Sequence, residues 1–129
     1  MTSLASIYVG GILTLMMATF HLRFPILFKW KADYRTVSEL NKKVSHTIHL
    51  ALIILFYSIG VLSLIYAKEL SECNGISFGL NLMVSIFWLW RTCWQIYYFK
   101  GKNMHFVLIV VFSLLFIAYS IPIILKLIE

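Results

Sequence analysis

The stretch HTIHLALIILFYSIGVLSLIYA, residues 46–67, decides the fold class of this chain. It contains no Asp, Glu, Lys or Arg, and the lysines Lys43 and Lys68 flank it. A helix needs roughly 20 apolar residues to cross the hydrocarbon core of a bilayer, because each residue adds about 1.5 Å of rise. The stretch therefore predicts a transmembrane helix.

Three further stretches of the chain have the same apolar character. The predicted spans are residues 3–22, 46–67, 75–98 and 104–125. The linkers between the second, third and fourth spans are short, and short linkers favour antiparallel neighbours. We therefore expect an all-α membrane protein, in which residues 1–129 form one up-down bundle of four transmembrane helices. The one substantial loop is predicted at residues 23–45.

The composition excludes a soluble domain. The chain has 129 residues, of which 61% are hydrophobic and only 12% are charged. A soluble domain of this size buries only part of its surface, so it has no room for so much apolar area. The net charge of +6 would suggest nucleic acid in a soluble protein. Here the basic residues flank the spans, and we expect no nucleic-acid partner.

Lysine and arginine are distributed unequally between the two sides of the predicted bundle. One side carries the basic residues of segment 23–45 together with Lys100 and Lys102, whereas the other carries Lys68 and Lys126. Basic loops stay on the cytoplasmic side of a membrane. We therefore expect an integral membrane protein with both termini on the non-cytoplasmic side.

Aromatic and basic residues alternate after the first span. Trp30 lies between Lys29 and Lys31. Tryptophan prefers the headgroup region of a bilayer and lysine prefers anionic lipid, so we expect these three residues to contact anionic lipids. Further along, Thr36 and Glu39 have the spacing of a capping box, which predicts a helix with Thr36 as its N-cap.

The candidate functional residues gather at the predicted cytoplasmic side. One histidine ends the first span, two begin the second, and one begins the fourth. Imidazoles on facing helices bind transition metals or haem iron, and a nearby arginine pairs with an anionic group. The predicted cofactor-binding residues are His21, His49, His105, Arg91 and Gln95. The predicted metal ligands are His21, His46, His49 and His105.

The residues leave more than one function open. No Asp or Glu lies within the predicted spans to act as a general base. We therefore expect a non-catalytic bundle, acting as a subunit of a membrane complex or as a homo-oligomer, with a basic cytoplasmic face. One alternative is a haem- or metal-binding membrane protein that uses the histidines. A second is a small channel or carrier along the polar stripe of the third span, from Asn81 to Gln95.

Several residues inside the spans are expected to serve packing. Gly10 and Gly11 in the first span and Gly60 in the second permit close contact between helices, either within the chain or at an oligomer seam. Trp88 is too deep in the third span for an interfacial aromatic belt, so we expect its indole ring to pack inside the bundle.

Three segments carry a resemblance to other proteins. The segment HLRFPILFKW (residues 21–30), the tripeptide LNK (residues 40–42) and the pentapeptide FWLWR (residues 87–91) resemble a group of small, uncharacterised four-helix bacterial inner-membrane proteins. That resemblance implies only the fold, the topology and a location in the bacterial inner membrane. The exit sequence FPILF (residues 24–28) is coarsely similar to four-helix, haem-linked protoporphyrinogen oxidase-type bundles, and no site residue follows from it.

Overall fold

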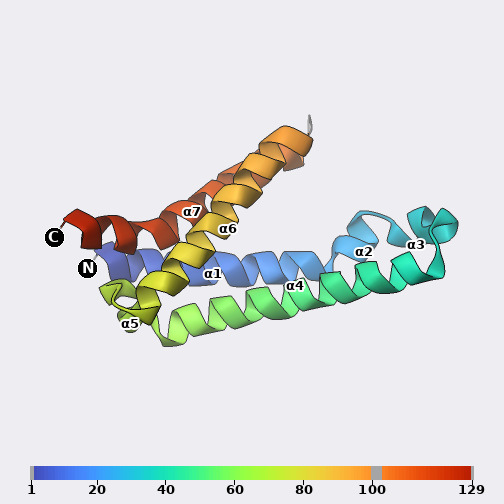
Figure 1. Cartoon of the computed structure of the whole chain (residues 1–129). Helices are drawn as coiled ribbons and strands as arrows, with labels where there is room; N and C mark the ends of the chain where they lie inside the picture. The colour runs from blue at the N-terminus through green and yellow to red at the C-terminus, as the bar shows by residue number, and fades with distance from the viewer. Residues whose placement is uncertain (1, 100–102, 129) are drawn as a thin grey trace.

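The computed structural model describes residues 2–99 and 103–128, and its architecture is four long helices joined by short ones (Figure 1). The long helices are α1 (Thr2–Leu22), α4 (Glu39–Ile65), α6 (Ile76–Tyr98) and α7 (Asn103–Ile128). All four are long and apolar enough to cross a membrane. The predicted all-α bundle is therefore confirmed, whereas Lys100 and Lys102, which contributed to the predicted topology, lie outside the described residues.

The connecting segments are mostly helical. They contain α2 (Phe24–Leu27), α3 (Trp30–Asp33), the 3-10 helix η1 (Tyr34–Thr36) and α5 (Ala67–Glu72). The prediction that Thr36 caps the second span is wrong, because Thr36 ends η1 and Val37 is extended. Ser38 is the N-cap instead, and its Oγ accepts a hydrogen bond from the backbone N–H of Asn41 at 3.4 Å.

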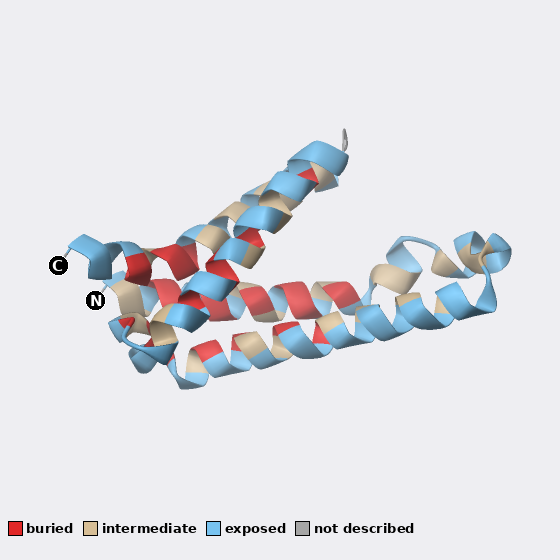
Figure 2. Ribbon diagram, viewed as in Figure 1, coloured by how far each residue is buried: buried red, intermediate tan, exposed pale blue. Residues whose placement is uncertain are grey.

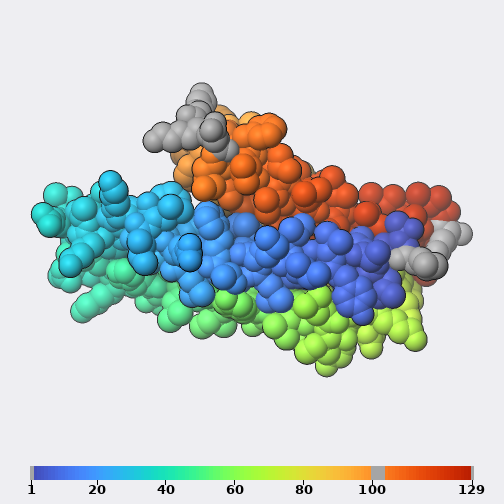
Figure 3. Space-filling model, turned by 180° about the vertical axis from the view of Figure 1, so that it is seen from behind, coloured from blue at the N-terminus to red at the C-terminus, as the bar shows by residue number. Residues whose placement is uncertain are grey.

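The long helices pair into two hairpins that diverge. Helix α1 packs along α4, α6 packs along α7, and α1 also contacts α7. The two hairpins meet at the end that holds both chain termini and α5, here called the termini end (Figure 1). From there α6–α7 leaves α1–α4 at an angle, and seen from behind it projects beyond them (Figure 3). The opposite end of α1–α4, which carries residues 23–45, is here called the loop end.

Glycines set the distance between α1 and α4. A Cβ atom on Gly60 would lie 2.7 Å from Leu15 Cδ2 and 3.2 Å from the Gly11 carbonyl oxygen. A Cβ atom on Gly11 would lie 2.8 Å from a methyl group of Leu64. The predicted close contact at these glycines is confirmed as a contact within one chain.

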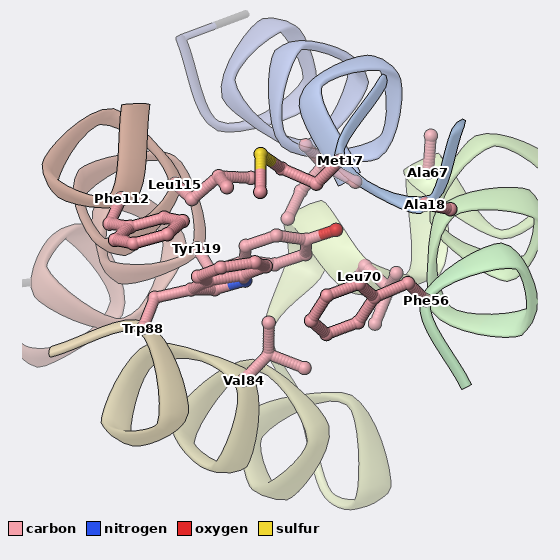
Figure 4. Packing of buried hydrophobic residues seen from close by; sticks show 11 residues of the cluster. Met17, Ala18, Phe56, Ala67, Leu70, Val84, Trp88, Phe112, Leu115 and Tyr119 are labelled. Carbon is pink, nitrogen blue, oxygen red and sulfur yellow. The ribbon is translucent and has the colours of Figure 1, made fainter. Parts of the chain in front are cut away.

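Aromatic rings fill the space where the two hairpins meet (Figure 4). Trp88 is 1% exposed, and its ring lies 5.2 Å from Phe56 of α4 and 5.5 Å from Phe112 of α7. The prediction that Trp88 packs inside is confirmed. Buried residues otherwise concentrate along α1, the helix that touches both α4 and α7 (Figure 2).

Several buried polar groups form hydrogen bonds between helices at the termini end. The Tyr119 hydroxyl lies 2.8 Å from Ser63 Oγ and 3.3 Å from Thr14 Oγ1, so one hydrogen-bonded cluster joins three long helices. Asn81 donates its amide N–H to the Leu70 carbonyl oxygen at 2.8 Å, which ties α6 to α5. These bonds hold the hairpins together at one end and leave the other end free to diverge.

Candidate functional site

Two of the predicted histidines lie side by side at the loop end. The rings of His21 on α1 and His49 on α4 are 6.2 Å apart between centroids and inclined by 28°. His21 is 8% exposed, and its Nδ1–H donates to the Met17 carbonyl oxygen at 2.8 Å. This bond fixes the tautomer, so the lone pair of the neutral ring is on Nε2. Phe24 stacks on His21 at 4.2 Å.

The third histidine of this end, His46, joins the same group through aromatic rings. Trp30 lies 5.6 Å from His46 and 4.8 Å from His49 between ring centroids. Tyr34 stacks on Trp30 at 5.3 Å, and its hydroxyl lies 2.6 Å from Ser45 Oγ. The imidazole–aromatic cluster consists of His21, Phe24, Trp30, Tyr34, His46 and His49.

The fourth histidine belongs to the other hairpin. His105 Nδ1 lies 3.3 Å from Gln95 Nε2, between α7 and α6. Because the hairpins diverge, the structure brings together His21 and His49, and it pairs His105 with Gln95. Within residues 2–99 and 103–128, no group of three or more His, Cys, Asp and Glu side chains is placed to hold a metal ion. Haem or metal binding therefore stays a prediction.

Arg91 is the charged residue of the predicted site. Its guanidinium carbon lies 4.7 Å from the centroid of the Phe112 ring and 5.5 Å from that of Phe99. Its Nη1 atom is buried and has no hydrogen-bond partner among the described residues. Gln95, one helical turn further on, is 2% exposed, and its Oε1 atom also lacks a partner there.

The polar stripe predicted for the third span faces the interior. Asn81, Ser85 and Gln95 are all buried on α6, on the same side as Trp88. Trp88 interrupts the stripe with a stack of aromatic rings on Phe56 and Phe112. Its polar groups therefore fall into two separate sets, one at the termini end and one around Arg91.

A depression at the loop end was not predicted as a site. Its volume is about 520 Å³, and it is lined by Pro25, Ile26, Trp30, Lys31, Tyr34, Arg35, Lys42 and His46. Trp30 and Lys31 were already expected at a lipid contact. Arg35 and Lys42 were counted only among the basic residues that predict the orientation in the membrane. The spacing of Lys31 and Arg35 could have indicated this depression from the sequence, because it places both residues on one side of a helical turn.

Comparison with known proteins assigns this chain to no family. No protein-family model, no curated protein and no solved structure matches this chain. The resemblance to small bacterial inner-membrane proteins stays an expectation, and the functional proposals rest on the geometry of the loop end and of the α6–α7 hairpin.

Proposed function

We propose that this chain is a non-catalytic integral membrane protein that binds anionic lipid headgroups in the depression at its loop end. The observation that supports the proposal is the joint lining of that depression by aromatic and basic side chains, directly beside the ends of two spans. With the loop end on the cytoplasmic side, as the positive-inside rule requires, the site would lie at the headgroups of the inner leaflet.

The lining divides into an apolar part and a charged part. Pro25, Ile26 and Trp30 offer apolar surface for the upper acyl chain, whereas Lys31 and Arg35 offer positive charge. Each basic residue near an anionic surface contributes about 1 kcal/mol. Trp30 is held in place by ring contacts with both Tyr34 and His46, so little side-chain freedom is lost on binding.

The proposal predicts that charge inside the depression matters more than charge beside it. We expect Lys31→Gln/Arg35→Gln to weaken binding of phosphatidylglycerol about tenfold, because two charges that contact the headgroup are lost. Energy transfer from tryptophan to pyrene-labelled phosphatidylglycerol, in detergent micelles, measures this affinity.

The matched control is Arg23→Gln/Lys43→Gln, which removes one arginine and one lysine that are exposed in the same part of the chain. We expect it to change the affinity less than threefold. An equal loss in both double variants would contradict a defined site, since it would mean that only net charge counts. Size-exclusion chromatography of the same samples tests the predicted homo-oligomer.

A second candidate function is metal or haem binding at the His21–His49 pair. The observation that favours it is the fixed tautomer of His21, which leaves Nε2 unprotonated beside a second imidazole. A hydrogen bond from the other ring nitrogen is the arrangement that orients histidine ligands in metal sites. The pair supplies two ligands, so further ligands would come from solvent, from the cofactor or from a second chain.

For this candidate we expect the purified protein to retain a transition metal or haem in stoichiometric amount. The bound group should be lost in His21→Ala and kept in His105→Ala, because His105 belongs to the other hairpin. Absorption spectroscopy with elemental analysis makes the measurement. Wild-type protein with neither a Soret band nor bound metal would rule the candidate out.

A further inference from the structure

We propose that the α6–α7 hairpin holds a second, separate binding site, at which Arg91 binds the phosphate or carboxylate of an anionic membrane amphiphile. This site shares no residue with the depression at the loop end. It rests on two buried polar atoms that have no hydrogen-bond partner among the described residues, Arg91 Nη1 and Gln95 Oε1, and on the half-buried ring of His105 beside them.

The first step concerns charge. Arg91 lies inside a helix long enough to cross a membrane, and a cation at such a depth is costly unless it is paired. The ion pair seen among the described residues joins Lys42 to Glu39, at the loop end. The carboxylates of the chain are Asp33, Glu39, Glu69, Glu72 and Glu129, and all lie outside the four predicted spans.

The second step concerns geometry. The guanidinium lies against Phe112 of α7 and close to Phe99, just beyond the end of α6. The side chain thus extends along α6 towards the headgroups, as a snorkelling arginine does. Nη1 is nevertheless buried without a partner among the described residues. A buried donor without an acceptor costs more free energy when it belongs to a charged group. We therefore expect an acceptor beside Nη1.

The third step concerns the neighbours of Arg91. Gln95 lies one turn away and directs Nε2 to His105 Nδ1, so the proton of the neutral His105 ring lies on Nε2. Gln95 Oε1 has no partner among the described residues and needs a donor. Arg91 and His105 thus supply donors, and Gln95 supplies an acceptor. A phosphate that carries a glycerol hydroxyl, as in phosphatidylglycerol, matches this set.

The site is placed where such a molecule can reach it. Arg91 lies one turn after Trp88, whose ring contacts Phe56 of α4, so Arg91 is near the side of α6–α7 that faces the other hairpin. The two hairpins diverge there (Figure 1). The depth is that of a headgroup at the membrane surface rather than of the bilayer centre.

The test is native mass spectrometry of the full-length protein in a non-ionic detergent, with dioleoylphosphatidylglycerol added. We expect one tightly held lipid per protomer beyond any bound at the loop end. Arg91→Gln should weaken this binding about tenfold, and Arg91→Lys should have a smaller effect, because lysine keeps the charge but not the planar fork. Arg23→Gln, an exposed arginine, serves as the control.

Oleate and inorganic phosphate distinguish the possible sources of the anion. Retention of oleate alone would assign the site to a carboxylate amphiphile, and retention of phosphatidylglycerol would assign it to a phospholipid; either supports the proposal. Retention of inorganic phosphate alone overturns it, since no apolar part is then recognised. Equal binding of phosphatidylcholine and phosphatidylglycerol, unchanged in Arg91→Gln, also overturns it. The Lys31→Gln/Arg35→Gln variant keeps this site, so the two proposals fail independently.

Discussion

Trp88→Ala is expected to lower the free energy of unfolding by about 3 kcal/mol, at the lower end of the range for buried aromatic side chains. The indole ring is 1% exposed and stacks on Phe112 at 5.5 Å, and Phe56 packs on it at 5.2 Å. Removing it leaves a cavity where the two hairpins meet. Lipid solvates apolar side chains as well as a protein core does, so the loss comes mainly from packing.

The matched control for Trp88 is Trp90→Ala in the same helix. Trp90 is 51% exposed, and we expect its removal to cost less than about 1 kcal/mol. Unfolding from dodecylmaltoside micelles by added SDS, followed by circular dichroism, compares the two. Similar losses for Trp88→Ala and Trp90→Ala would show that the hairpins do not meet at Trp88.

Gly60→Val is expected to destabilise the α1–α4 hairpin by about 2–3 kcal/mol, the upper range for overpacking. Even the first added carbon would meet Leu15 Cδ2 at 2.7 Å and the Gly11 carbonyl oxygen at 3.2 Å. Leu15 can rotate away, but the backbone of Gly11 cannot move without separating the two helices. The pairing of His21 with His49 depends on the same hairpin, so their ring contact should be lost as well.

Gly79→Val provides the comparison for Gly60. A Cβ atom at Gly79 of α6 has no described heavy atom within 4 Å, so we expect a change below about 1 kcal/mol. The same SDS titration measures both variants. A Gly60→Val protein as stable as the Gly79→Val protein would mean that α1 and α4 do not pack closely.

The candidate site was predictable from the sequence only in part. The four histidines were expected at one depth; His21 lies at the end of α1 and His105 at the start of α7, whereas α4 begins at Glu39, so His46 and His49 lie inside it. The sequence did not predict which of the four histidines lie in the same hairpin. His21 and His49 meet because α1 pairs with α4, and His105 contacts Gln95 because α7 pairs with α6.

At the loop end, too, the sequence predicted the local structure only in part. The alternation of Lys29, Trp30 and Lys31 predicted an interfacial segment, but the capping position was placed two residues too early. The observed N-cap, Ser38, is of a residue type that is favoured at this position as Thr is. Thr36 does not cap α4 because it ends η1 and is followed by the extended Val37. The contact between Tyr34 and Ser45 also folds the segment back on α4.

The hydropathy of the chain was enough to give four apolar helices, their approximate bounds and the inward side of α6, because in lipid every span must satisfy its backbone within itself. The inward position of Asn81 followed from the helical spacing of the polar stripe, and that of Trp88 followed from its depth in the span. The angle between the hairpins could not be derived in that way. It results from where small and large side chains meet between helices: glycines bring α1 close to α4, while Trp88 and Phe56 bridge α4 and α6 where the backbones stay further apart. Such contacts join residues far apart in the sequence, so only the tertiary structure decided that the histidines divide between two hairpins and that Arg91 Nη1 has no hydrogen-bond partner among the described residues.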